Sequence, residues 1–255
     1  MNAGPILKWN EGDAQSLRPK YLPRSAWIGH GPFAMWLVQA IAPRVIVELG
    51  THNGYSYFSM CQAIKDAGLQ SKAYAVDTWQ GDDHAGFYRD QVYQVVALAN
   101  QPYENFSTLL RKRFDQALPD IAAGSVDLLH VDSRHGYEDV KEDFESWIPK
   151  LSDRAIVLFH DTEVLDRGFG VYKYWAELTK KHTGFAFRQS HGLGVLFFGA
   201  NQTDAAKVLI AQASTPEGID QLRQRFVKLG RRTRLRYVGQ RAIQRIASFF
   251  QVQRS

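Results

Sequence analysis

The residues of this sequence that could do chemistry gather where short apolar segments end. The first such segment, residues 45–49, carries Glu48 and runs into the loop Gly50-Thr51-His52-Asn53-Gly54. Glycines let the backbone approach a ligand closely, and the first N–H groups of a following helix are free to bind it. Because burying an unpaired acid costs free energy, Glu48 is expected to bind a ligand or a partner group. The loop, with hydroxyls from Thr51 and Ser56, suits the carboxylate and ammonium groups of an amino-acid moiety.

A second acid, Asp77, follows the apolar residues 73–76. An acid at the end of the second strand can accept hydrogen bonds from both hydroxyls of a ribose. Together, Glu48 and Asp77 indicate a nucleoside-type cofactor. The three-glycine fingerprint of dinucleotide dehydrogenases is not met, because a glycine is missing between Gly50 and Gly54.

Two later apolar segments end in an acid beside a histidine, at Asp132 with His135 and at Asp161 with His160. The carboxyl ends of parallel strands meet at one edge of a sheet, so the two loops are expected to face one cleft. An imidazole can take up a hydroxyl proton near neutral pH. We therefore predict His135 as a general base beside Asp132. For His160, a structural role with hydrogen bonds to the backbone is the alternative.

These residues are spaced along alternating strands and helices. Strands are predicted at residues 45–49, 73–76, 107–113, 126–131, 155–159, 185–189 and 192–198. Helices are predicted at residues 33–41, 55–67, 87–99, 137–148 and 171–182. The last two strands are almost adjacent and must be antiparallel, because a parallel crossover needs a dozen or more residues. The pattern predicts an α/β fold with a doubly wound, mostly parallel seven-stranded sheet and an antiparallel closing strand.

The strand ends resemble class I S-adenosylmethionine-dependent methyltransferases, which also tend to close their sheet with an antiparallel strand. The resemblance covers roughly residues 25–200, and in detail it points to a bacterial subfamily associated with glycosyltransferases of surface-polysaccharide synthesis. It is carried by VELGTHNG (47–54), VDTWQGD (76–82), HVDSRHGYE (130–138), FHDT (159–162) and GLGV (192–195).

The resemblance implies S-adenosyl-L-methionine as the cofactor. Gly50 and its neighbours would hold the methionine part and Asp77 the ribose, and residues 114–116 would lie near the adenine. The predicted cofactor-binding set is Glu48, Gly50, Thr51, Asn53, Gly54, Ser56, Asp77, Asp115 and Asp132.

Related O-methyltransferases hold magnesium with carboxylates at two of these strand ends. Here the candidates are Asp132 and Asp161, with His160 as a further ligand, and a bound Mg or Mn ion would lower the pKa of a hydroxyl. The sequence departs from that pattern because histidines stand beside the carboxylates, and histidine is a poor ligand for magnesium. A metal and a base acting alone both remain open.

A polar loop containing Trp79, Asp83 and His84 follows the second strand. Its composition suits the rim of a substrate site, where it would contact a sugar. The alternative is a lid that packs Trp79 over the cofactor.

Charge divides the chain in two. All 26 acidic residues lie at or before Asp220, with 21 of the 31 basic ones, so the first part carries −5 and the remainder +10. In the basic part, apolar residues recur at helical spacing, and Gly230 and Gly239 are predicted to interrupt the helix. The apolar positions are Leu222, Phe226, Leu229, Ala242, Ile246 and Phe249.

Three roles are open for this basic tail: peripheral contact with an anionic membrane, docking to a partner such as a glycosyltransferase, or a solvated tail. Nucleic acid is not expected, because the acidic body offers no continuing surface.

The chain is predicted to comprise an irregular segment (1–24), a methyltransferase domain (25–202) and a C-terminal helical region with the basic amphipathic tail (203–255). The single cysteine, Cys61, fits a reducing cytosol. We expect a cytoplasmic protein, or one at the inner face of the cell membrane.

The resemblance implies O-methylation of a sugar hydroxyl in a surface glycan or its precursor, so the expected partner is a small-molecule or glycan acceptor. One alternative is a nicotinamide-dependent oxidoreductase on a similar sheet. The other is a non-catalytic domain that docks glycosyltransferases.

Overall fold

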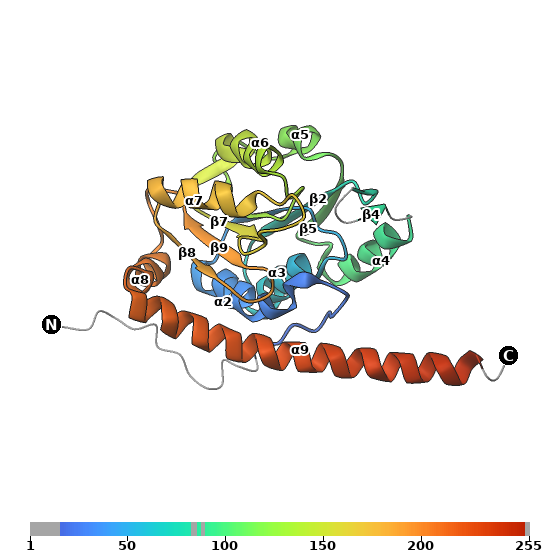
Figure 1. The fold of residues 1–255 in the computed structure, drawn as a ribbon. Coiled ribbons are helices and arrows are strands. Elements are labelled where there is room, and N and C mark those ends of the chain that lie inside the picture. Colours follow the sequence, from blue (N-terminus) through green and yellow to red (C-terminus); the bar gives the residue numbers. More distant parts are fainter. Residues whose placement is uncertain (1–15, 83–85, 88–89, 253–255) are drawn as a thin grey trace.

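A computed structural model describes residues 16–82, 86–87 and 90–252 (Figure 1). Its centre is a seven-stranded sheet in the order β5-β2-β1-β6-β7-β9-β8. The strands are β1 (Val45–Leu49), β2 (Lys72–Asp77), β5 (Ser107–Arg111), β6 (Val126–Val131), β7 (Leu151–His160), β8 (Gly184–Phe187) and β9 (Leu193–Phe197). A separate antiparallel pair consists of β3 (Gly81–Asp82) and β4 (Gly86–Phe87).

The first five strands of the sheet are parallel, and β9 runs antiparallel to both of its neighbours. The predicted fold class is therefore confirmed. Strand order reverses between β1 and β6, which is where open α/β sheets bind ligands. The clearest difference from the predicted bounds is β7, which starts at Leu151 because that residue pairs with Val126 ahead of a register shift.

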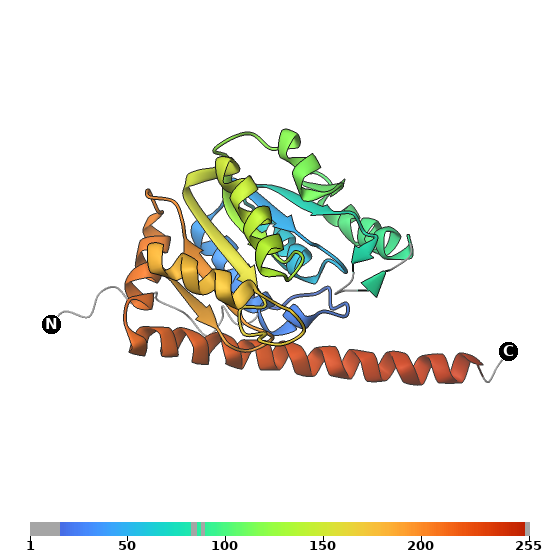
Figure 2. The ribbon, with the colours of Figure 1, turned by 45° about the horizontal axis from the view of Figure 1, so that its top comes forward.

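Helices cover both faces of the sheet, as Figures 1 and 2 show. One face carries α5 (Phe114–Ala117), α6 (Tyr137–Trp147) and α7 (Val171–Lys181). The other carries η1 (Ala26–Gly29), α2 (Gly31–Ile41), α3 (Tyr55–Asp66), α8 (Asp204–Ala213) and the first part of α9 (Pro216–Val252). Near the β5 edge lies α4 (Gln91–Asn100), and the short turns η2 (Gln101–Tyr103), η3 (Leu118–Asp120) and η4 (Ile148–Lys150) follow other helices.

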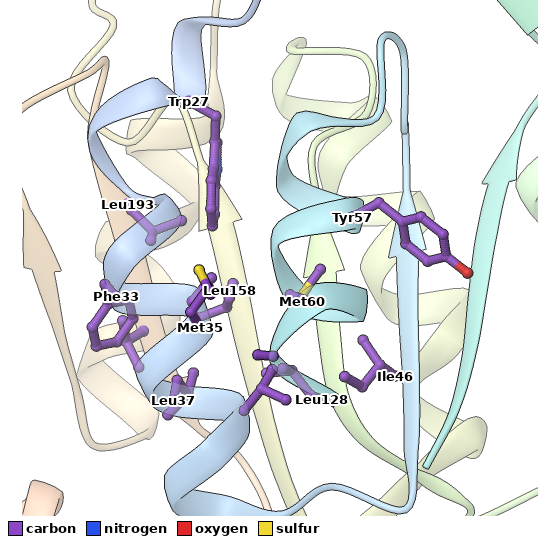
Figure 3. Close-up of a cluster of buried hydrophobic side chains, with 14 of the residues drawn as sticks. Trp27, Phe33, Met35, Leu37, Ile46, Tyr57, Met60, Leu128, Leu158 and Leu193 are labelled. Atoms are coloured by element: carbon purple, nitrogen blue, oxygen red, sulfur yellow. The ribbon is translucent and has the colours of Figure 1, made fainter. Parts of the chain in front are cut away.

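Alternate side chains of the central strands fill two separate cores. Ile46, Leu128 and Leu158 point into the core shared with α2 and α3 (Figure 3). Val47 and Leu129, one residue further along each strand, belong to the core under α6 and α7. Burial on both faces explains why these strands are short continuous apolar runs.

The predicted interruption of the last helix is wrong, because α9 is continuous through both glycines. Glycine in a helix costs about 1 kcal/mol relative to alanine. At Gly230 the reason is packing: a Cβ there would collide with the carbonyl oxygen of Gly29, so the missing side chain lets α9 approach η1. Phe226 of α9 also contacts Phe33, with ring centroids 5.1 Å apart.

Candidate functional site

The ends of β1, β2, β6 and β7 surround a cavity of about 480 Å³. This volume lies within the range of small-molecule sites. The cavity is at the point where strand order reverses, as the sequence predicts for the cofactor. Most of the predicted binding residues line it: Gly50, Thr51, Asn53, Gly54, Ser56, Asp77, Asp115 and Asp132.

The glycine loop is held tightly against the end of β6. Gly50 has a φ of 87° and Gly54 a φ of 80°, a region that favours glycine. A Cβ on Gly50 would collide with the carbonyl oxygen of Asp132. This close approach brings the start of α3, with its free N–H groups, to the cavity.

Asp77 joins the two loops that follow β1 and β2. One carboxylate oxygen accepts a hydrogen bond from the His52 backbone N–H at 2.8 Å, and the other from Trp79 N–H at 2.6 Å. Burial raises the pKa of Asp77 above its usual value. The carboxylate therefore stiffens the cavity wall while remaining part of its lining.

Glu48 differs from its predicted role, because it is fully buried and does not line the cavity. Its Oε2 lies 2.7 Å from Nδ1 of His130, which is also fully buried. Burial raises the pKa of Glu48, and hydrogen bonds from His130 and Ser56 oppose that rise. Glu48 thus connects β1 to His130 of β6 and to Ser56 in the first turn of α3.

Asp115 also lines the cavity; its side chain is largely exposed and lies 3.0 Å from Nε of Arg113. Ser133 and Asp143 are among the lining residues that were not predicted from the sequence. Burial raises the pKa of Asp143 to about 6, although the Ser133 hydroxyl opposes the shift. The sequence offered no signal for Asp143, since it is one of several acids on an amphipathic helix.

The four residues predicted for the reacting end do come together. Nε2 of His135 lies 2.8 Å from Oδ2 of Asp161 and 4.0 Å from Oδ1 of Asp132. Nδ1 of His160 lies 3.1 Å from that same Asp132 oxygen. His191, half-exposed and not predicted, adds Nδ1 at 3.2 Å from Oδ1 of Asp161.

His160 is a buried residue of this cluster that contacts protein groups through both ring nitrogens. Burial alone would lower its pKa, but the charges of Asp132 and Asp161 raise it well above its usual value. Its other ring nitrogen lies 3.0 Å from the carbonyl oxygen of Ser190. Because one ring nitrogen faces Asp132 and the other faces Ser190, both nitrogens of His160 are engaged by protein oxygens, which does not fit its predicted role as a metal ligand.

Asp132, His135 and Asp161 form a different donor set. One donor atom from each lies within 4.8 Å of the others, which is close enough for a shared cation. Burial opposes ionisation of both acids. His160 nevertheless holds the pKa of Asp132 below its usual range, and His160 together with His135 does the same for Asp161. Both carboxylates are therefore charged and able to bind a cation.

The predicted substrate rim is only partly described, because Asp83 and His84 lie outside the described residues. Trp79 is fully buried, and its indole N–H donates to the carbonyl of His52 at 2.9 Å. It supports the loop and does not reach the cavity. Instead, Phe169 lines the reacting end, stacked on His135 with ring centroids 4.2 Å apart.

Residues 47–162 match the family model described as a methyltransferase domain. Over this segment the chain is similar to methyltransferase domains. The match begins in β1 and ends just after β7, so it contains the glycine loop, Asp77 and the Asp132–His135–Asp161 cluster.

Solved structures show the same fold at low sequence identity. Rv0187 from MTB, described as cofactor-bound, aligns with a TM-score of 0.52 at 17% identity, covering 74% of this chain and 88% of that one. The O-methyltransferase TomG from Streptomyces achromogenes, in complex with SAM, has a TM-score of 0.51 at 17% identity, covering 76% and 92%. The SAH-bound methyltransferase PaMTH1 from Podospora anserina has a TM-score of 0.50 at 15% identity, covering 77% and 99%.

A curated relative is much closer in sequence. The uncharacterized protein y4gI from Sinorhizobium fredii is 61% identical over 177 residues, which is 69% of this chain. The aligned region spans only 20% of that protein's length.

Proposed function

We propose that this domain binds S-adenosyl-L-methionine in the cavity and transfers its methyl group to a hydroxyl oxygen. The observation that carries the proposal is that one cavity joins Asp77 at its cofactor end to Asp132, His135 and Asp161 at the other. The description of TomG as an O-methyltransferase in complex with SAM supports the same assignment.

The residues proposed to bind the cofactor are held in place by the fold. The loop from Gly50 to Gly54 and the first turn of α3 offer backbone N–H groups to the methionine carboxylate. The Asp77 carboxylate accepts hydrogen bonds from the ribose hydroxyls through lone pairs that its two backbone bonds leave available. A cofactor held there would share the cavity with the residues at the β6 and β7 ends, where the acceptor would receive its methyl group.

The transfer itself needs alignment of the oxygen with the methyl group and removal of the hydroxyl proton. As placed, Nε2 of His135 lies 2.8 Å from Oδ2 of Asp161. For this nitrogen to accept the hydroxyl proton or to bind a cation, its contact with Asp161 must open.

The convergence of three donor atoms favours a divalent cation as the activating group. Asp132, His135 and Asp161 would hold it, and when bound it supplies a positive charge that lowers the pKa of the acceptor hydroxyl. His160 then keeps Asp132 oriented from the buried side. General-base catalysis by His135 without a cation is the alternative, and activity in the presence of a chelator separates the two.

For the acceptor we propose a sugar hydroxyl, as the sequence resemblance implies. Polar side chains with several hydrogen-bond donors, Arg134, Arg167 and His191, line the cavity around the reacting cluster. Such a lining suits a polyhydroxylated molecule better than an apolar one.

The test is calorimetric titration of the protein with S-adenosylhomocysteine and, in parallel, with NAD. We expect micromolar-scale binding of the former and none of the latter. Tight NAD binding without S-adenosylhomocysteine binding would make the domain an oxidoreductase. Transfer of labelled methyl from S-adenosylmethionine to a panel of sugars and catechols then tests the acceptor class, and transfer to catechols alone would refute the sugar.

A further inference from the structure

The long helix α9 changes its surroundings half-way along. In its first half, Leu222, Phe226, Leu229 and Thr233 are buried against the body. In its second half, every side chain described from residue 238 to residue 243 is exposed. Figures 1 and 2 both show the helix running along the body and then continuing past it. The second half is thus an arm beyond the domain.

The face of the helix that packs on the body becomes polar where the arm begins. At ~100° per residue, the four buried positions share one side of α9, and Gln240 continues that side. Gln240 is exposed. The arm therefore has no apolar face with which to extend its contact with its own domain.

An apolar stripe appears on the opposite side. Leu235, Val238 and Ile243 are 73%, 56% and 69% exposed, and with Ala242 they fall within an arc of roughly 140° at ~100° per residue. At ~100° per residue, the centre of this arc lies roughly 140° from the centre of the packed face. Among the described residues, half of the large exposed hydrophobic side chains are these three. The stripe therefore faces away from the body.

The charge of the helix indicates what covers this stripe. No acidic residue follows Asp220, and arginines accompany the stripe from end to end. Arg231, Arg232, Arg234 and Arg241 are all exposed. A second copy of the helix would bring two uncompensated cationic surfaces together. A negatively charged flat surface would match both the arginines and the stripe.

We propose that the outer face of α9 binds an anionic lipid surface, with Leu235, Val238 and Ile243 inserted between the headgroups and the arginines beside the phosphates. Each basic side chain near such a surface strengthens the electrostatic attraction to it. Because the apolar side chains also insert, high salt should weaken the binding without abolishing it. No helix among the described residues is long and apolar enough to cross a membrane. The helix would lie in the interface and carry the methyltransferase domain above it.

Vesicle flotation of the full chain tests the proposal. We expect binding to vesicles of phosphatidylglycerol mixed with phosphatidylcholine, little binding to phosphatidylcholine alone, and weaker binding as salt rises. The triple variant Leu235→Gln, Val238→Gln, Ile243→Gln should bind roughly tenfold less or weaker still. The matched control is Val95→Gln, Leu98→Gln, Leu165→Gln, which removes three equally exposed hydrophobics elsewhere and should bind normally.

Two results would overturn the proposal. One is equal vesicle binding by the α9 triple variant and the wild-type chain. The other is a wild-type chain that does not bind the vesicles but sediments as a dimer, together with an α9 triple variant that sediments as a monomer. That result would show that the stripe binds a second copy of the chain.

Labelling distinguishes insertion of this face from general electrostatic attraction. Val238→Cys and Gln240→Cys variants are labelled with an environment-sensitive dye, which spares the native Cys61 because that thiol is buried. On addition of the anionic vesicles, the dye at position 238 should shift to the blue and the dye at position 240 should not. Equal shifts at both positions would show that the stripe does not insert.

Discussion

Replacing Asp77 by asparagine tests the cofactor site without knowledge of the acceptor. The substitution preserves size but removes the charge that ties together the loops after β1 and β2. In the wild type, both oxygens accept backbone N–H bonds, from His52 at 2.8 Å and from Trp79 at 2.6 Å. The asparagine NH2 group cannot accept either bond, so one backbone donor loses its partner.

The expected loss of stability follows from these contacts. A hydrogen bond to a charged group contributes about 1.5–3 kcal/mol, and leaving a buried donor unsatisfied costs a similar amount. The wild-type carboxylate is itself penalised by burial, which raises its pKa. We therefore expect Asp77→Asn to lower the free energy of unfolding by about 2 kcal/mol.

The ligand affinity is a separate expectation. If Asp77 also holds the ribose, S-adenosylhomocysteine should bind about 10- to 100-fold more weakly in Asp77→Asn, measured by calorimetry at a temperature where the variant is fully folded. Asp120→Asn is the matched control, since Asp120 pairs with Lys112 at 2.6 Å on the surface and such pairs contribute little. Reduced stability with unchanged affinity would leave Asp77 as a loop tie only, and no effect on either would refute the reasoning altogether.

Two further variants test the cation and the framework of the sheet. Manganese binding, measured by calorimetry, should weaken about tenfold or more in Asp161→Asn with S-adenosylhomocysteine affinity nearly unchanged; undiminished manganese binding would remove the cation from the site. Asp127, which is 2% exposed, accepts hydrogen bonds from Arg44 at 2.8 Å and Arg154 at 2.6 Å, so Asp127→Ala should lower the free energy of unfolding by about 3 kcal/mol at neutral pH. Burial would raise the pKa of Asp127, but the two arginines hold it well below its usual value, so its contribution should be complete above about pH 5 and fade as the pH drops below ~4. A stability difference from wild type that did not shrink between pH 5 and pH 2 in chemical denaturation would contradict this assignment.

The sequence by itself determined the sheet and the place of the cavity. Its strands are short apolar runs, and parallel strands all end at one edge, so an acid or glycine just after a run must lie at that edge. This is why Gly50, Asp77, Asp132 and Asp161 could be placed at one cavity from local signals alone. The antiparallel pairing of the last two strands was also predictable from a local feature, because the link between them is too short for a parallel crossover.

Only the tertiary structure decided which of these side chains face the cavity and which support it. Glu48 turns away to His130 because β1 and β6 are neighbours, with Glu48 opposite His130 in the register. Carboxylates at two different strand ends, Asp132 and Asp161, raise the pKa of His160. The pairs Glu48–His130 and His160–Asp132 are far apart in the sequence, and no spacing rule connects them.

The same limit explains the last helix. Its charge and amphipathic spacing are local properties, and they were visible in the sequence. The sequence could not show that Gly230 meets the backbone of Gly29 and that Phe226 enters the core beside Phe33. Those contacts depend on how the chain returns to η1 and α2. Helical periodicity identifies an apolar face, but only the packed structure decides which face is covered by the body and which is left outside.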